Sequence, residues 1–246
     1  MRTVVKAFLR YLPRRRSLSL LQVVGIACGV AAVIGMVVSS RSALSSFTEA
    51  MEFLSGKATH SMERFAGPLE ETLLVRLMHD PAVRSFSPVI ERRVRLESGE
   101  PLRLLGIDPF LDGTVRPQMI RAENDKTDPA KERGNLLSFL LDERAVILDR
   151  STALRLGLKQ GDTIITSKGK LHLVDTFSTP TPEPLILMDI GHAQELFNLR
   201  GKVDRVDLTL SVKQIAAFRN RWGGGFRIQS LEQKEQTYRN MLRAFR

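Results

Sequence analysis

An uncharged stretch near the amino end, Leu18–Ser40, restricts this chain more than any other feature of its sequence. It reads LSLLQVVGIACGVAAVIGMVVSS, and it is followed by Arg41. As a helix that rises about 1.5 Å per residue, it would be about 34 Å long, which is enough to cross a hydrocarbon core of about 30 Å with some tilt. The sequence therefore predicts a membrane protein with one transmembrane helix, within residues 14–41.

The charges on either side of this stretch predict its orientation. Seven of the 37 Lys and Arg residues lie in residues 1–41, where there is no acidic residue, and six of these seven precede the apolar stretch. By the positive-inside rule, the N-terminus stays in the cytoplasm and residues 42–246 are periplasmic or extracellular. This predicts a place in the bacterial cytoplasmic (inner) membrane, with the basic segment on anionic membrane lipid. The rest of the chain carries 30 cations against all 27 acidic residues, and this near-neutral balance predicts no nucleic-acid partner.

Residues 1–13 predict an amphipathic interfacial helix along the inner leaflet. Pro13 would end it, and a frayed basic tail is the alternative. The apolar face and the cationic face of this helix would be formed by Val4, Val5, Phe8, Leu9 and Leu12 and by Arg2, Lys6 and Arg10.

A retained anchor is favoured over a cleaved signal, because the apolar run exceeds the usual 7–15 residues and residues 40–42 make a poor cleavage site. Cys28, the sole cysteine, invites a lipoprotein interpretation, but the apolar run continues well past it. One cysteine excludes an internal disulfide and a cysteine-based metal site. Gly25 and Gly29 form a GxxxG pair, which would let another helix approach closely.

No second apolar stretch of 18 residues follows Ser40, so residues 42–230 are predicted to form one extracytoplasmic domain of α+β class. Helical spacing continues over residues 42–58, and a second helix is expected at Pro68–Asp80. Strands are expected at Val89–Glu97, Leu102–Ile107, Ala145–Leu148, Thr163–Thr166, Leu171–Phe177, Leu185–Met188 and Val203–Leu210, the last with one face in water. Short helices are expected at Ser151–Leu156, His192–Leu199 and Val212–Trp222.

Three further segments have their own signals. Glu123–Asn135 is polar without an apolar pattern, which predicts a loop or small insertion at about residues 120–138. Gly223–Gly225 predicts a turn that leads into a short strand, rather than a phosphate-binding loop. Ser230–Gln233 is a capping-box sequence, which predicts a helix over residues 231–246 that leads back to the membrane.

No catalytic, cofactor-binding or metal-binding residue is predicted, and the substrate-binding residues are unknown. The Walker A pattern is missing, because Gly56-Lys57 is followed by Ala58 and Met51 precedes Gly56 by five residues. G-x-S-x-G is also missing, and Cys28 would lie in lipid. Surface or turn positions are expected for His60, His79, His172 and His192, and turn-forming roles for Asp108, Asp112, Asp162 and Asp175. The sequence therefore predicts that the chain is not an enzyme.

Several segments, in their order and spacing, resemble the FtsX/MacB-like ABC transporter permease family, which includes macrolide exporters, lipoprotein-releasing permeases and the cell-division permease. The apolar span, LLQVVGIACGVAAVIGMVVSSRSAL, resembles the family's first transmembrane helix. Ala145–Ile164 (AVILDRSTALRLGLKQGDTI) resembles the strand, short helix and L-G-L-x-x-G-D of the family's extracytoplasmic domain. Leu104–Pro109 (LLGIDP) resembles the G-[IV]-D-P strand end of the same domain, and Asp189–Leu210 is similar to its later helix and strand. In the L-G-L-x-x-G-D segment, Gly157 would end the helix with a positive φ, and Gly161-Asp162 would turn the chain.

The resemblance implies a mixed α/β domain of the MacB periplasmic type and the N-terminal part of a transport permease. It also implies mechanotransmission, in which ATP bound by a partner subunit, a cytoplasmic ABC ATPase, moves the helix and the outer domain. The implied partners are further permease transmembrane helices or a second permease copy, and a periplasmic adaptor. A non-transporting coupler between the ATPase and an envelope enzyme is the alternative. Family members carry further spans after this domain, so the chain is expected to be a fragment of a permease or a split or degenerate member.

Overall fold

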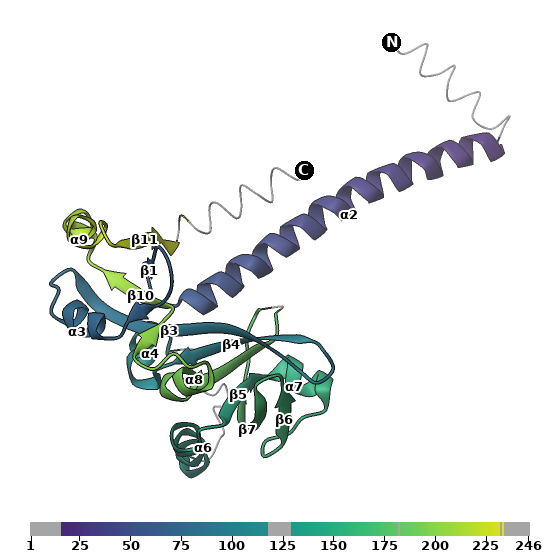
Figure 1. The fold of residues 1–246 in the computed structure, drawn as a ribbon. Coiled ribbons are helices and arrows are strands. Elements are labelled where there is room, and N and C mark those ends of the chain that lie inside the picture. Colours follow the sequence, from purple (N-terminus) through teal and green to yellow (C-terminus); the bar gives the residue numbers. More distant parts are fainter. Residues whose placement is uncertain (1–15, 118–128, 182, 232, 234–246) are drawn as a thin grey trace. The chain divides into compact units, whose positions relative to one another are not determined.

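The computed structural model describes residues 16–117, 129–181, 183–231 and 233, and it divides the chain into two units, Met1–Ser46 and Phe47–Arg246 (Figure 1). Helix α2 (Arg16–Ser55) has 40 residues, begins in the first unit and ends in the second. Within the described residues, Leu20–Ser39 is the stretch that is long and apolar enough to cross a membrane, with a mean hydropathy of 2.4. The predicted N-terminal apolar helix and its continuation past residue 42 are therefore confirmed.

The second unit contains all the other described elements. Its helices are α3 (Thr72–Met78), α4 (Pro109–Val115), α6 (Pro129–Leu141), α7 (Arg150–Leu156), α8 (Ile190–Leu196) and α9 (Ile215–Trp222), with a 3-10 turn, η2, at Val212–Gln214. Its strands are β1 (His60–Arg64), β2 (Leu69–Glu70), β3 (Val83–Arg95), β4 (Pro101–Ile107), β5 (Ala145–Asp149), β6 (Thr163–Thr166), β7 (Gly169–Phe177), β8 (Leu185–Asp189), β9 (Lys202–Val203), β10 (Arg205–Leu210) and β11 (Phe226–Ser230).

Nine of these strands form one mixed sheet, in the order β11-β1-β10-β3-β4-β8-β5-β7-β6. Two neighbouring pairs, β4 with β8 and β5 with β7, are parallel, and the other neighbours are antiparallel. Strands β2 and β9 form a separate antiparallel pair. The sheet with its short helices confirms the predicted α+β class.

The core lies on both faces of the sheet, because side chains alternate along each strand. On β4, Leu104 belongs to the larger apolar cluster, whereas Leu105 and Ile107 belong to the smaller one. Helices α3, α7, α8 and α9 contribute side chains to the larger cluster. The last turn of α2 contributes Phe53 and Leu54 to the smaller cluster, so the end of the apolar helix is part of the fold of the second unit.

The L-G-L-x-x-G-D segment folds as predicted. Gly157 ends α7 in the left-handed region, with φ of 68°, and its N–H bonds back to the carbonyls of Ala153 and Leu154. The N–H of Leu158 also bonds to the carbonyl of Ala153, at 2.9 Å. Gly161 follows with φ of 94°, and Asp162 accepts a hydrogen bond from the N–H of Lys159 at 2.7 Å. These residues shape the chain and lie in no candidate binding site.

Several expectations were wrong in detail. The helix predicted at Pro68–Asp80 is shorter, since β2 takes its first residues and α3 begins at Thr72. The loop predicted at about residues 120–138 is helical from Pro129, because α6 occupies Pro129–Leu141. Strand β1 was not predicted, since its sequence HSMER alternates too weakly. The strand ending at Leu210 has no wet face, because Asp207 is only 3% exposed. The helices predicted at residues 1–13 and 231–246 fall almost wholly outside the described residues.

Candidate functional site

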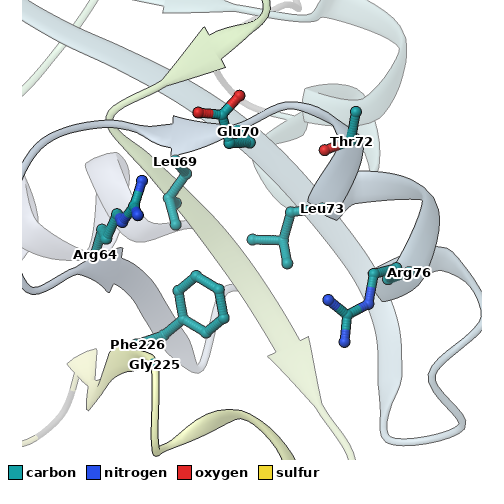
Figure 2. A pocket seen from close by; sticks show the side chains of 8 residues that line it. All are labelled: Arg64, Leu69, Glu70, Thr72, Leu73, Arg76, Gly225 and Phe226. Carbon is teal, nitrogen blue, oxygen red and sulfur yellow. The ribbon is translucent and has the colours of Figure 1, made fainter.

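Two hollows lie among the described residues of the second unit. One has a volume of about 340 Å³ and lies between β2 and α3 on one side and the start of β11 on the other (Figure 2). The other, of about 750 Å³, is lined by Glu143, Arg144, Lys168, Gly191, His192, Gln194, Glu195, Leu196 and Arg200. Neither lining includes serine or cysteine, and among the described residues no three His, Cys, Asp or Glu side chains are grouped so that they could hold a metal ion.

The arrangement with the most buried polar chemistry lies where α2 ends. We call it the helix anchor. On one side are Phe53, Leu54, Gly56 and Lys57, and on the other are Val115, Phe177 and the buried polar side chains of Ser87, Asp112, Arg116 and Asp207. The rings of Phe53 and Phe177 stack with centroids 6.3 Å apart and an interplanar angle of 13°. The N–H of Lys57 donates to the carbonyl of Val115 at 2.7 Å. Apolar and backbone contacts therefore hold the last turn of α2 against α4 and β7.

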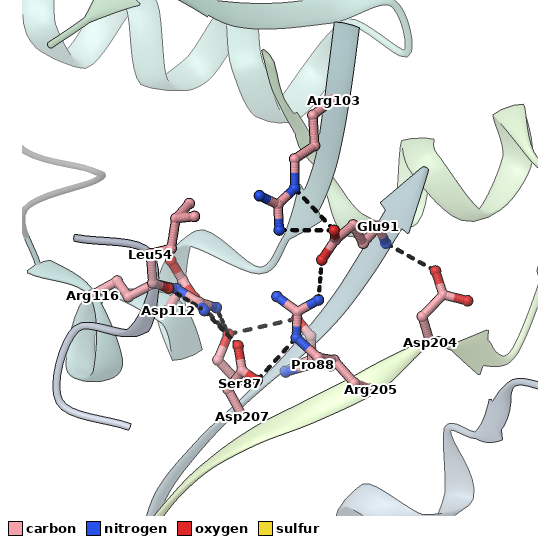
Figure 3. Close-up of polar contacts among 10 residues, drawn as sticks. All are labelled: Leu54, Ser87, Pro88, Glu91, Arg103, Asp112, Arg116, Asp204, Arg205 and Asp207. Atoms are coloured by element: carbon pink, nitrogen blue, oxygen red, sulfur yellow. Dashed lines mark hydrogen bonds and ion pairs between the residues drawn. The ribbon is translucent and has the colours of Figure 1, made fainter. Parts of the chain in front are cut away.

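Arg116 is the central side chain of the helix anchor and is only 1% exposed. Its Nη1 donates to the carbonyl oxygen of Leu54 at 3.1 Å and to Oδ2 of Asp207 at 2.6 Å (Figure 3). Its Nε donates to Oδ1 of Asp112 at 2.9 Å, and Nη2 also contacts Asp112 and the hydroxyl of Ser87. The carbonyl of Leu54 belongs to the last turn of a helix, where carbonyls have no partner within the helix. Arg116 thus caps the end of α2 and links it to α4, β3 and β10.

Gly56 permits the close approach at this point. Its φ is 56°, a conformation that side chains with a Cβ rarely adopt, and a Cβ there would lie 2.3 Å from the carbonyl oxygen of Val115 and 2.6 Å from Cγ of Arg116. Any larger residue would therefore push the end of α2 away from α4. Gly67 provides a contrast, since its φ is 75° but a Cβ there would meet nothing within 4 Å.

The charges of the helix anchor are compensated in spite of their burial. Burial alone would lower the pKa of Arg116, but the charges of Asp207 and Asp112 raise it above its ordinary value. Burial alone would raise the pKa of Asp207, but Arg205 and Arg116 bring it below its ordinary value. Arg116, Asp207 and the neighbouring Arg205, whose pKa is raised by Asp207 and Glu91, therefore stay charged near neutral pH.

The ion-pair network continues across the sheet from the helix anchor. Arg205 donates from Nε to Asp207 at 3.0 Å and also pairs with Glu91, which accepts from Nε of Arg103 at 2.9 Å (Figure 3). The network therefore runs over β10, β3 and β4, beside the smaller apolar cluster that contains Phe53. A buried charge without its partner destabilises the folded state. The network therefore favours one arrangement of these strands and the end of α2.

The histidines and aspartates noted in the sequence are not brought together. His79 is exposed, and His172 pairs with Asp142 at 2.7 Å on the surface. His60 was expected at the surface and is instead buried in β1, at 5% exposure. Asp108 caps α4 as a turn residue should, whereas Asp112 is fully buried in the helix anchor. Asp112 and Arg116 are four residues apart, and that i,i+4 spacing of opposite charges was the available signal for the site.

Comparisons with known proteins agree with the fold. Residues 19–220 match the family described as MacB-like periplasmic core domain. The chain is 30% identical over 249 positions to an uncharacterised ABC transporter permease protein of Mycobacterium tuberculosis, covering 96% of this chain and 28% of that protein. The chain thus spans just over a quarter of the length of this relative.

Two solved structures share the fold. The periplasmic region of MacB from Actinobacillus actinomycetemcomitans superposes with a TM-score of 0.51 and 12% identity, over 76% of this chain and 94% of that one. The extracellular domain of the noncanonic ABC-type transporter YknZ from Gram-positive bacteria gives a TM-score of 0.51 and 13% identity, over 70% of this chain and 100% of that one. At these identities the two structures establish the fold alone. Together with the family match over residues 19–220, they confirm the expected domain type: the chain belongs to the family of ABC transporter permeases with a MacB-like periplasmic core domain.

Proposed function

We propose that this chain is the N-terminal part of a permease that carries out transport or export driven by a partner ATPase. In this proposal the residues before α2 lie in the cytoplasm, α2 crosses the inner membrane, and the second unit lies in the periplasm or outside the cell. The six cations before the apolar stretch support this orientation. The chain binds no cofactor and catalyses no reaction itself, because a cytoplasmic ABC ATPase binds the ATP.

The second part of the proposal is mechanotransmission through the helix anchor. One observation carries it: a single helix contains the apolar stretch Leu20–Ser39, and its last turn is held by the buried Arg116 through the carbonyl of Leu54. Movement of α2 would act on α4, β3 and β10, since Arg116 contacts side chains in or beside all three. A helix joined only through a loop would have no such attachment.

Gly56 and Gly67 offer a matched pair of variants to test this. Both glycines have a positive φ, but only Gly56→Ala places a Cβ against the helix anchor. In a membrane-reconstituted complex of the permease with its ATPase, ATP with vanadate should change hydrogen–deuterium exchange in β3, α4 and β10. We expect Gly67→Ala to keep that ATP-dependent change and Gly56→Ala to lose it while retaining ATPase activity. If Gly56→Ala responds to ATP as the unmodified protein does, the helix anchor does not transmit movement.

Assays on the same reconstituted complex can distinguish a transporter from a non-transporting coupler. A permease should show ATP-dependent movement or release of a substrate from reconstituted vesicles. A non-transporting coupler should instead stimulate an envelope enzyme, with no substrate moved. The name "ABC transporter permease" of the relative at 30% identity is the reason to propose transport first.

A further inference from the structure

The smaller hollow beside α3, which we call the arginine groove, has a two-part chemistry. Its floor is apolar and consists of Leu69 from β2, Leu73 from α3 and Phe226 from β11 (Figure 2). Leu69 and Leu73 are 1% and 6% exposed, so this floor is part of the core. Arg64 and Arg76 stand on either side of Phe226. An apolar floor between two cations fits a ligand that is itself apolar and anionic.

The fold places both arginines at the groove, and a ring contact holds the guanidinium group of Arg76. Arg64 lies directly opposite Phe226 in the pairing of β1 with β11. Arg76 lies over the ring of Trp222, with its Cζ 4.7 Å from the ring centroid, and that ring is 5.9 Å from the ring of Phe226. Stacking on an aromatic ring holds a guanidinium group while its N–H edge stays available to an acceptor.

Neither arginine is neutralised by the described part of the chain. No ion pair joins Arg64 or Arg76 to an acidic side chain there, whereas the nearby Arg221 is paired with Asp80 at 2.6 Å. Glu70 also lines the groove, but its carboxylate points away from Phe226 (Figure 2). The groove therefore offers positive charge to an external carboxylate.

The surroundings of the groove suit a protein surface. Large apolar side chains are exposed on the chain next to Arg64 and on α3: Phe65 at 60%, Val75 at 61% and Met78 at 65%. These side chains would add apolar contact area to a protein segment bound beside the groove. A volume of about 340 Å³ lies at the low end for ligand pockets, which suits a few side chains better than the acyl chains of a lipid. The chain's own last residues, 234–246, carry four Lys and Arg against one Glu, so their charge does not complement the groove.

We propose that the arginine groove binds a segment of a partner protein in which an apolar side chain stands beside a carboxylate. The carboxylate binds between Arg64 and Arg76, and the apolar side chain covers Phe226 and Leu73. This recognition does not depend on the helix anchor transmitting movement, and binding can be measured without ATP or transport.

Trp222 provides a built-in reporter, because it is the sole tryptophan of the chain and contacts both Arg76 and Phe226. The full chain in phosphatidylcholine nanodiscs is titrated with the capped peptide GSFEEFSG, which contains no tryptophan, while the fluorescence of Trp222 is recorded. The matched peptide GSFQQFSG differs in its two carboxylates alone. We expect saturable binding of the acidic peptide, binding of the neutral peptide weaker by about tenfold or more, and a loss of the difference at high salt.

Variants of the two arginines then test whether these side chains bind the carboxylates of the peptide. Arg64→Gln and Arg76→Gln should each weaken binding of GSFEEFSG by about tenfold, since charge-assisted hydrogen bonds are lost. Arg95→Gln is the matched control: Arg95 is exposed on β3, forms no ion pair in the described part of the chain and lies outside the groove. The charge reversal Arg64→Glu should reduce binding of GSFEEFSG and increase binding of the basic peptide GSFKKFSG, a gain that a misfolded variant cannot show.

Equal binding of GSFEEFSG and GSFQQFSG would overturn the proposal, as would an equal loss in Arg95→Gln. A lipid headgroup is the competing ligand, tested by adding phosphatidylglycerol vesicles in place of peptide. If the vesicles change Trp222 fluorescence in a manner that requires Arg64 and Arg76, while the peptides do not, the groove binds membrane and the proposal of a protein partner is wrong.

Discussion

Replacing Arg116 by methionine removes the cation that holds Asp112 and the carbonyl of Leu54, and it fills much of the same space. Asp207 would keep the Nε of Arg205 at 3.0 Å, but Asp112 would keep only the hydroxyl of Ser87 at 2.6 Å. Oδ2 of Asp112 already has no hydrogen-bond partner among the described residues. Breaking a buried pair by removing one partner costs about 3–5 kcal/mol. A single domain has about 5–15 kcal/mol in total, so Arg116→Met should remove a large share of the free energy of unfolding of the second unit.

The assay is urea unfolding of the protein in an uncharged detergent, followed by the fluorescence of Trp222. A second substitution should restore part of the stability. Adding Asp112→Asn to Arg116→Met should recover about 1–3 kcal/mol of the free energy of unfolding, because the buried carboxylate left without a cation is removed. Adding Asp207→Asn should recover less, since it removes a partner of Arg205. Arg155→Met is the control, because its pair with Glu100 is on the surface and should leave the unfolding curve nearly unchanged.

Two results would refute this reasoning about the buried network. One is a loss below about 1 kcal/mol for Arg116→Met, which is the range of an exposed pair. The other is a larger recovery from Asp207→Asn than from Asp112→Asn, which would mean that the stranded charge is not where the contacts place it.

Three other predictions can be checked with the same protein. Gly157→Ala should destabilise it by about 1 kcal/mol, because φ is 68°, whereas Gly134→Ala within α6 meets nothing within 4 Å and should stabilise it by about 0.5–1 kcal/mol; urea unfolding measures both. Burial and the charge of Arg219 lower the pKa of His60, so the unfolded state binds the proton more readily and stability should fall as the pH drops below about 6.5. His60→Gln should show a smaller loss of unfolding free energy between pH 7.5 and 5.5, and an unchanged loss would contradict the assignment. Alkaline phosphatase fused after Arg246 should be active if the second unit is outside the cytoplasm, because that enzyme needs an oxidising compartment, and inactive fusions would reverse the orientation.

The strands that could be predicted most closely from the sequence are those that form short continuous apolar runs. In β4 and β8, apolar residues occupy both faces, and the runs Leu102–Ile107 and Leu185–Met188 were found nearly to the residue. β1 was not predicted, because its polar residues Ser61 and His60 are buried only through pairing of the strand with both β10 and β11. Local sequence has no signal for burial of that kind.

Most of the helix anchor could not be predicted from the sequence for a similar reason. Its polar groups come from α2, α4, β3 and β10, and Asp207 was expected on the wet face of its strand. Only the spacing of Asp112 and Arg116 is local, and a pair at i,i+4 is also common on exposed helices. Which acid and base become buried together depends on strand order, and strand order follows from the whole chain.

The pairing of β1 has a consequence for how the protein is made. Thr59, just before β1, bonds to Leu208 across a separation of 149 residues, and Asp207 comes from the same late strand. Long-range pairings of this kind form slowly and late. If α2 spans a membrane as proposed, its apolar stretch is synthesised well before β10, so it can enter lipid before the strands that hold its far end have been made. Membrane insertion and folding of the second unit would then be separate steps, and β1 and the end of α2 would take their final positions only after β10 has been synthesised.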